Sequence, residues 1–579
     1  MQWWKAWVPS NSLACLYTIA EDCAARKLLG DDIELTVDGH DEQNCVLPIE
    51  RIADKLTAPG AGGLVCLTGV QSNQYPRALA LAKRFRARGV NVAIGGFHVS
   101  GVLSMLKKLT PELQDAVDHG IILFAGEAEE HFAGLIKDVA TGQAKTLYNY
   151  MDDLPDLRGA PAPVLPARLV KRYDGVMSSF DAGRGCPFHC SFCTIINVQG
   201  RKSRWRDADD IEIIIRANAA QGVKKFFITD DNFARNRNWE AIFDRMILLS
   251  ERDGLHIHFF IQVDTLAHKI PNFVSKAARA GCRYVFVGLE SINAANLKEM
   301  GKAQNRITEY RKTFQAWKNE GVLTYAGYIL GLPDDSRESI RRDIEVMQRE
   351  LPVDLVEFTM LTPLPGSEDH KRLYDKGVWM EPDLNVYDLE NVTLNHPKMT
   401  KEEWQQTYFD AWEWYYSEEH VERLVRRNVA YGVKTVRILR SVLQIVAAVR
   451  YEGVHPLQGG YFRIKQRRER RPELPLESAP VFYAKRAAEL WRKYTGVLVY
   501  GASLWRLRRR IEADPLKNAY TDEAISEVVD AENETLEMFT LNDSARAAVI
   551  KAKRGQSGTI TVTATSDGLT KATTTIETK

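Results

Sequence analysis

The chain has 579 residues, of which 45% are hydrophobic and 26% are charged, and its formal net charge at pH 7 is +1. One hydrophobic core does not support this length, so we expect about three or four domains. The composition excludes a disordered or fibrous protein, and no apolar run approaches the ~18 residues of a membrane-spanning helix. The start, MQWWK, lacks the features of a signal peptide, so we expect a cytoplasmic protein.

Residues 1–150 alternate between predicted helices and strands. Helical periodicity covers 13–29, 49–56 and 76–88, and strands are expected at 32–37, 63–70, 90–94 and 120–124. Strand, crossover helix and strand in repetition indicate an α/β, doubly wound parallel sheet of the Rossmann-like kind. Such folds bind ligands at the carboxyl ends of their strands, where this segment places its glycine-containing turns.

A second alternating series follows a linker. Residues 151–174 are rich in Pro and Asp and predict a connection without regular structure. Within 175–390, apolar strands are expected at 225–228, 256–261, 284–288, 324–330 and 355–361. About six βα units predict a partial (β/α)6 barrel, whose chemistry lies at the carboxyl ends of its strands.

Residues 391–530 predict a basic helical domain. One helix begins at Thr400, with Glu403 completing a capping box. The segment 421–510 holds 21 Lys and Arg but 6 Asp and Glu, so its net charge is +15 and the rest of the chain carries −14. Such a segment, joined to apolar helices, predicts either ordinary helices covering the barrel or a peripheral contact with an anionic membrane surface. No nucleic-acid-binding motif accompanies the charge, so we expect no nucleic-acid partner.

The last residues, 531–579, end in a Thr-rich alternating stretch. This tail predicts an edge hairpin, a disordered extension or a remnant of cloning, and no function is assigned to it.

The sharpest feature of the sequence is a cluster of three cysteines. Cys186, Cys190 and Cys193 form a C-x3-C-x2-C motif early in the second alternating series, ahead of the strand expected at 225–228. Thiolates are the soft ligands that iron–sulfur clusters require, and three of them hold three irons of a cubane while the fourth iron stays open. Zinc is the alternative, but a structural zinc site needs four ligands, and His189 lies inside the loop where its reach is poor.

This motif, with Phe192 before the last cysteine, resembles that of the radical S-adenosylmethionine (radical SAM) superfamily. An α/β domain ahead of the cysteines resembles the subgroup with a cobalamin-binding domain. The resemblance covers roughly residues 1–370. It implies a [4Fe-4S] cluster whose open iron binds SAM, and a 5′-deoxyadenosyl radical formed when SAM is cleaved. It also implies a cobalamin cofactor.

The resemblance also implies individual contacts. SAM contacts are expected at Phe192, Asp230, Asp231, Asn232, Gln262, Glu290 and Ser291. Cobalamin contacts are expected at Gly69, Gln71, Gly95, Gly96, His98, Gly126 and Glu127. Each also has a plainer interpretation as a turn, a cap or strand packing. Cobalamin domains that bind cobalt through histidine carry Asp-x-His-x-x-Gly, and Asp38-Gly39-His40 lacks the closing glycine, so we expect no His40–cobalt bond.

The resemblance implies a C-methyltransferase acting on an unactivated carbon. The alternatives are a radical cyclase or ring-rearranging enzyme without net methyl transfer, and a non-catalytic iron–sulfur redox protein. We expect a small-molecule substrate, lipid-like or amphiphilic in view of the basic segment, and a reducing partner such as flavodoxin or ferredoxin. A peripheral position at the inner membrane face goes with that substrate. The sequence identifies no residue that acts on the substrate itself.

Overall fold

The computed structural model describes residues 2–302, 305, 309–469 and 474–526, and the backbone of four short strands beyond them. Contacts divide the chain into two units, Met1–Val528 and Val529–Lys579. In the second unit, β15 (Leu541–Asn542) pairs with β16 (Ala545–Arg546), and β17 (Gly558–Ala564) pairs with β18 (Ala572–Thr578). The rest of the predicted tail lies outside the described residues. The domain boundaries expected before residue 528 stay predictions.

The predicted N-terminal sheet is present and parallel. Its order is β2 (Leu64–Leu67), β3 (Asn91–Gly95), β4 (Ile122–Ala125) and β5 (Leu147–Asn149). Helices cover one face with α2 (Ile49–Leu56), α3 (Tyr75–Arg86), α4 (Phe97–Leu106) and α5 (Pro111–Asp118), and the other with α1 (Asn11–Ala25) and α6 (Phe132–Ala140). Since both faces are covered, the strands read as continuous apolar runs rather than alternating ones.

One expectation for this region was wrong. The described residues 32–37 form no strand, because they are largely exposed and meet no neighbouring strand with which to pair. The chain start forms a strand outside this sheet, β1 (Gln2–Ala6), which pairs antiparallel with β14 (Gly460–Ile464).

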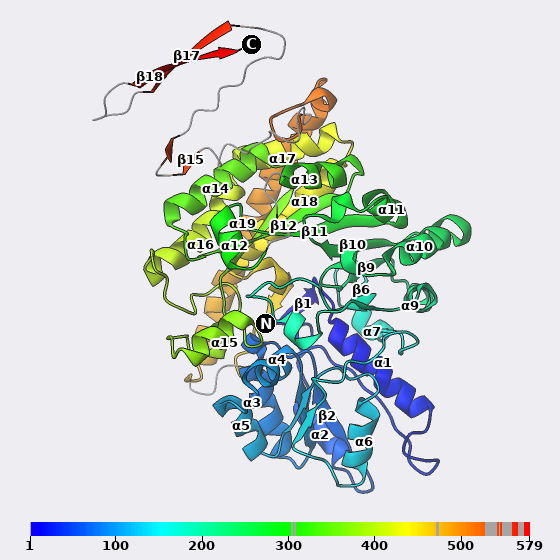
Figure 1. The fold of residues 1–579 in the computed structure, drawn as a ribbon. Coiled ribbons are helices and arrows are strands. Elements are labelled where there is room, and N and C mark those ends of the chain that lie inside the picture. Colours follow the sequence, from blue (N-terminus) through cyan, green and yellow to red (C-terminus); the bar gives the residue numbers. More distant parts are fainter. Residues whose placement is uncertain are drawn as a thin grey trace. The chain divides into compact units, whose positions relative to one another are not determined.

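The barrel is an open sheet of six parallel strands. Its order is β6 (Met177–Phe180), β9 (Lys225–Ile228), β10 (His258–Val263), β11 (Cys282–Glu290), β12 (Leu323–Leu330) and β13 (Leu355–Met360). Its connecting helices are α9 (Ala208–Ala220), α10 (Trp239–Asp253), α11 (Phe273–Ala280), α12 (Ala294–Glu299), α13 (Tyr310–Asn319) and α14 (Arg337–Glu350). In Figure 1 these green strands lie beside the blue and cyan sheet of the N-terminal region. The predicted α/β class and partial barrel are confirmed.

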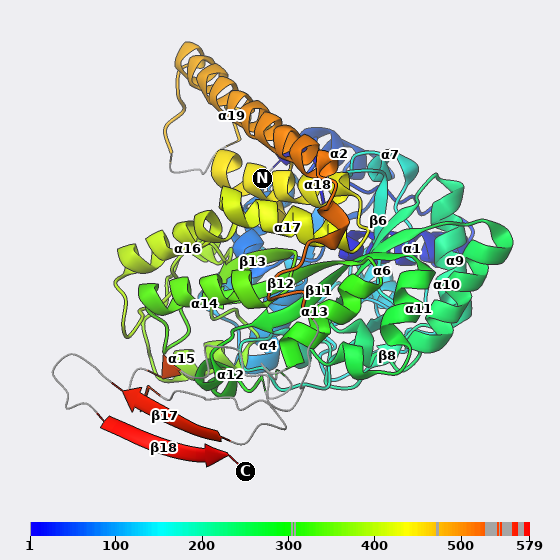
Figure 2. The same ribbon diagram turned by 90° about the horizontal axis from the view of Figure 1, so that it is seen from above.

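The region after the barrel is helical, as predicted. Its helices are α15 (Glu368–Asp375), α16 (Lys401–Tyr415), α17 (Glu418–Ala430), α18 (Thr435–Val446) and α19 (Ala479–Ala513). At the start of α16 the Thr400 hydroxyl accepts a hydrogen bond from the Glu403 N–H at 3.1 Å, which is the N-cap half of the expected capping box. Figure 2 shows α19 running past α17 and α18 as a single long helix. Within the described part of the chain, the search for a helix both long and apolar enough to cross a membrane finds none.

Candidate functional site

The three cysteines lie on one loop that two short strands close at its base. β7 (Gly183–Arg184) pairs antiparallel with β8 (Arg204–Trp205), and residues 185–203 between them form the cysteine loop, which includes α8 (Ile195–Val198). Inside the loop, the Cys193 N–H donates to the Cys190 carbonyl oxygen at 3.2 Å. The loop follows the carboxyl end of β6, so the thiols are held at the face of the barrel where ligands bind.

The thiols form one electrostatic group with Asp231 and Lys302. Burial raises the pKa of Cys186, and it raises the pKa of Cys193 to about 12. Cys190 is 7% exposed, and its charge acts on both other thiols. The Lys302 ammonium is buried and acts on Cys190 and Cys193 in turn. The Lys302 cation opposes this burial effect, because a positive charge favours the thiolate form that binds metal.

This donor set fits an iron–sulfur cluster better than a closed zinc site. Three thiols can hold three irons of a cubane and leave the fourth iron open. His189, the candidate fourth zinc ligand, contacts the Arg201 guanidinium through its Nδ1 atom. Among the described residues, no three His, Cys, Asp or Glu side chains converge to hold a single metal ion.

The two aspartates after β9 have different surroundings. Asp230 is 3% exposed, and its carboxylate accepts hydrogen bonds from the Ala182 N–H at 2.7 Å and from the Asn236 amide at 3.0 Å. These bonds hold the turn between β6 and β7. Asp231 instead acts electrostatically on the cluster thiols. Burial raises the pKa of both carboxyls to about 7, with the Asp230 charge adding to the effect on Asp231. Of the two, Asp231 is the one beside the cluster.

Asn232 and Asp264 belong to a supporting network. The Asn232 amide donates to the Asp264 carboxylate at 3.0 Å, and Arg235 makes a two-point ion pair with the same carboxylate at 2.6 and 2.8 Å. The Arg235 guanidinium also lies 5.5 Å from the ring centre of Phe188 in the cysteine loop. Asn232 therefore uses its amide to hold Asp264, and through Arg235 this network contacts the cysteine loop.

The end of β11 carries a strained acidic residue. Glu290 has φ +62°, in the left-handed region that non-glycine residues rarely adopt, and such strain concentrates at functional sites. Its carboxylate pairs with the Lys302 ammonium at 2.5 Å, and that ammonium lies 5.5 Å from the ring centre of Phe192. Ser291 is buried and accepts from the Asn293 N–H at 3.0 Å. Lys302 therefore contacts both Glu290 and Phe192 beside the thiols.

Gln262 lies on the neighbouring strand, at the carboxyl end of β10. Its amide donates to a main-chain carbonyl at the end of β9 at 3.4 Å, a long bond that leaves the amide available to a ligand.

A cavity of about 160 Å³ opens at the carboxyl edge of the four-stranded sheet. Residues of α1 and α6 and the turns after β2, β3 and β4 line it, and Arg184, Val198 and Gln199 close it on the barrel side. A cavity of ~150 Å³ holds one ring-sized group. The space therefore fits the benzimidazole tail of a cobalamin, while a corrin macrocycle needs the open side.

The predicted glycines line this cavity, and at Gly96 the backbone geometry requires a glycine. Gly69, Gly95, Gly96 and Gly126 all contribute to its wall. Gly96 has φ +140°, and a Cβ there would lie 2.2 Å from the Val70 nitrogen. The turns after β2 and β3 thus pack backbone to backbone, and this close packing forms the cavity rim.

Two of the predicted cobalamin contacts are not among the residues that line the cavity. His98 is fully buried, with Nδ1 3.1 Å from the Ser72 hydroxyl and its ring 4.4 Å from the ring of Tyr75. Gln71 is exposed and caps the short turn that begins at Ser72. His40 lies 3.3 Å from a neighbouring aspartate and likewise stands outside the cavity wall. Periodicity cannot show which way a side chain after a strand turns.

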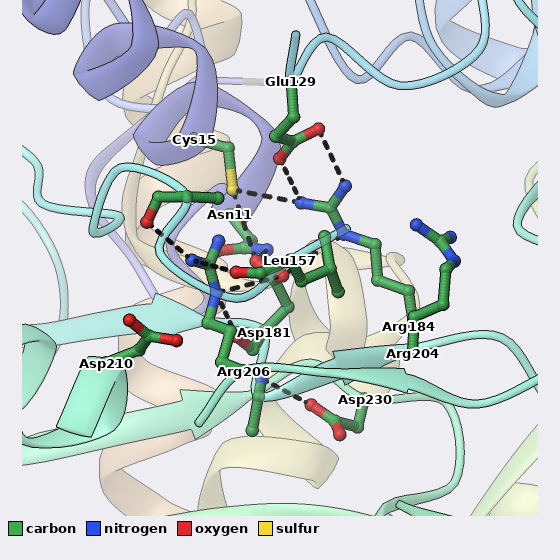
Figure 3. Close-up of polar contacts among 12 residues, drawn as sticks. Asn11, Cys15, Glu129, Leu157, Asp181, Arg184, Arg204, Arg206, Asp210 and Asp230 are labelled. Atoms are coloured by element: carbon green, nitrogen blue, oxygen red, sulfur yellow. Dashed lines mark hydrogen bonds and ion pairs between the residues drawn. The ribbon is translucent and has the colours of Figure 1, made fainter. Parts of the chain in front are cut away.

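The sequence pattern did not predict the ionic network that borders the cavity. Glu127, expected to contact cobalamin, pairs with Arg184 at 2.6 Å and also with Arg204. Figure 3 shows the Arg184 guanidinium pointing at the Glu129 carboxylate, 2.6 Å away. Arg184 stands two residues before the first cysteine, which was the one available signal. Lys302, near the thiols in space but far from them in sequence, had none.

Comparisons with known proteins agree with this geometry. The sequence model of the radical SAM superfamily matches residues 182–347, from the end of β6 into α14. The bacteriochlorophyllide d C-8(2)-methyltransferase of Chlorobaculum tepidum is 26% identical over 63% of this chain and 81% of its own length. The anaerobic magnesium-protoporphyrin IX monomethyl ester cyclase of Rubrivivax gelatinosus is 27% identical over 60% of this chain and 64% of its own length.

A solved structure shares the fold. The radical S-adenosylmethionine methyltransferase TsrM from Kitasatospora setae, with cobalamin and a [4Fe-4S] cluster bound, superposes with a TM-score of 0.53 at 15% identity. The match covers 75% of this chain and 96% of that one. At this identity the likeness establishes the arrangement of a Rossmann-like domain and a partial barrel.

Proposed function

We propose that this chain, a radical SAM enzyme that resembles the cobalamin-binding members of its superfamily, is a methyltransferase acting on an unactivated carbon of a small molecule. The observation that carries the proposal is the contact between the two candidate cofactor sites. The cavity of the Rossmann-like domain is closed by Arg184, Val198 and Gln199, which flank or belong to the cysteine loop. A methyl carrier in that cavity would therefore lie next to the radical source.

The residues divide between three groups. Cys186, Cys190 and Cys193 would hold a [4Fe-4S] cluster, with Lys302 beside them. Asp231, Gln262 and Glu290 would contact SAM at the carboxyl ends of β9, β10 and β11. The cavity at the sheet edge would hold the cobalamin tail. When bound, these groups supply a 5′-deoxyadenosyl radical and a transferable methyl group, and a flavodoxin or ferredoxin would supply electrons.

The proposal can be tested by incubation with extract of a strain that lacks this protein. The reaction contains reduced, reconstituted protein, hydroxocobalamin and methyl-labelled SAM. Methyl transfer consumes one SAM as methyl donor and a second as radical source. The methyl donor leaves S-adenosylhomocysteine and the radical source leaves 5′-deoxyadenosine, so we expect the two in about equal amounts. The label should appear in a new product. Protein lacking the three cysteines is the control.

Cyclisation is the second candidate, and the similarity to the Rubrivivax gelatinosus cyclase favours it. A cyclase would release 5′-deoxyadenosine without S-adenosylhomocysteine and without labelled product. That result would replace the methyltransferase by the cyclase. Absence of both nucleosides would contradict an active enzyme of either kind.

The substrate is proposed to be amphiphilic and reached at a membrane surface. Along α19, Trp491, Leu498 and Trp505 repeat every seven residues, so they share one side of the helix, and they are 76%, 72% and 54% exposed. Arg509 lies over the Trp505 ring at 5.0 Å. Leu504, on another side of the helix, is buried, and α19 packs against α17 and α18. Aromatic and aliphatic side chains bordered by arginine are typical of helices that lie in a membrane interface.

Vesicle cosedimentation tests this surface. Replacing Trp491, Leu498 and Trp505 by glutamate should abolish binding to anionic vesicles, because each fully buried apolar side chain contributes about 1.5–3 kcal/mol. Salt should weaken the remaining electrostatic part, which is about 1 kcal/mol for each nearby arginine or lysine. Ile213→Glu, at a 57% exposed position on the barrel helix α9, is the matched control. Equal binding by all three proteins, or none by the wild type, would contradict the proposal.

A further inference from the structure

Two arginines face each other at the base of the cysteine loop. Arg184 on β7 and Arg204 on β8 are directly paired in the short ladder that closes residues 185–203. Like charges placed opposite one another across two strands are destabilising. The side chains of Arg184 and Arg204 are 10% and 16% exposed, so water screens them weakly. The loop can therefore close at its base only if other groups neutralise this pair.

Asp181, three residues before Arg184, pairs with the Arg184 Nε atom at 3.2 Å, and the other neutralising groups come from the N-terminal sheet. Glu127, in the turn after β4, receives Arg184 on one oxygen at 2.6 Å and Arg204 on the same oxygen at 2.9 Å. Arg204 also contacts the second Glu127 oxygen. Glu129 receives both terminal nitrogens of Arg184 at 2.6 and 3.0 Å. One carboxylate therefore ties the two strands together, and the next holds the first of them (Figure 3 shows the Glu129 contact).

The same turn forms part of the cavity wall. Gly126, Glu127 and Glu129 line the cavity together with Arg184. We propose that Glu127 is a positioning residue that clamps the base of the cysteine loop and thereby couples the filling of the cavity to the cluster. The proposal rests on the proposed function in placing cobalamin in the cavity, although the clamp itself needs no occupant.

Coupling between two sites is reciprocal, which gives a direct measurement. If cluster assembly and cavity filling share Glu127, the cluster must change cobalamin affinity by the factor with which cobalamin changes cluster binding. We expect hydroxocobalamin to bind reconstituted wild-type protein at least about fivefold more tightly than the same protein freed of iron. In Glu127→Gln this ratio should fall to about one, while Asp54→Asn, which removes an exposed ion pair with Arg88, should keep it.

A second measurement, the rate of iron loss, tests the clamp without cobalamin. Loss of iron to a chelator should be faster in Glu127→Gln, because Arg204 then loses its carboxylate partner while it still lies opposite Arg184. Adding Arg204→Gln to that variant removes the repulsion, so iron retention should recover while the affinity ratio stays near one. This recovery would assign the iron loss of the single variant to the opposed charges.

The outcomes separate the two proposals. Wild-type iron retention in Glu127→Gln would overturn the clamp, and a wild-type affinity ratio in that variant would overturn the coupling. If hydroxocobalamin fails to bind the wild type at all, the cofactor assignment falls, and the iron measurement still decides the clamp.

Discussion

Replacing Cys186, Cys190 and Cys193 together by alanine is expected to leave a folded protein that holds neither iron nor sulfide. Wild-type protein reconstituted without oxygen should contain about four of each per chain and show the absorbance shoulder of a cubane. The triple variant should show none, because the cysteine loop offers no other soft ligand. Turnover should be lost with the cluster. Iron and sulfide assays with an absorbance spectrum make the measurement.

Cys282→Ala serves as the matched control. Cys282 begins β11, at the end of that strand away from Glu290, and burial raises the pKa of its thiol, which therefore stays protonated. Iron and sulfide should be unchanged in this control. Freshly purified wild-type protein with stoichiometric zinc and no sulfide would instead support the structural zinc site.

The strands of this fold were predictable because they are buried on both faces. The expected strand at 225–228 coincides with β9, and the helix at 49–56 coincides with α2. The expected strand at 32–37 failed for the opposite reason: its alternation of residue types lies in an exposed segment without a partner. The pairing of β1 with β14 joins residues more than 450 positions apart, and no local pattern encodes it.

The site was predictable where strand ends determine it. The carboxyl ends of parallel strands share one edge, so the turns after β2, β3 and β4 had to meet, and they do so around the cavity. Side-chain partners were not predictable in this way. Lys302 reaches Glu290, and Glu127 reaches Arg184, through packing between elements that no sequence period relates. These contacts differ between Glu290, which pairs with a lysine near the thiols, and Glu127, which pairs with an arginine at the base of the cysteine loop. A sequence motif does not show this difference.

Asp231→Asn is expected to weaken SAM binding by about 10- to 150-fold without changing the iron content. Asp231 acts electrostatically on the cluster thiols, and we propose that it accepts a hydrogen bond from the SAM ammonium group. Loss of one charge-assisted hydrogen bond costs about 1.5–3 kcal/mol, which is the stated range of affinity. Asparagine keeps the shape and removes the charge, so the loop should stay intact. Titration of the reconstituted variant with SAM gives the value.

Asp230→Asn, one residue earlier, should behave in the opposite way. Its carboxylate is occupied by the Ala182 N–H and the Asn236 amide, and an asparagine amide would face the Asn236 amide as donor against donor. A buried donor left without a partner costs about 1–3 kcal/mol, so urea unfolding should register the change. SAM affinity, measured where the variant is folded, should change less than in Asp231→Asn. Equal SAM affinity in Asp231→Asn and the wild type would remove Asp231 from the SAM site, whereas an equal loss in both variants would mean that the pair acts as one unit.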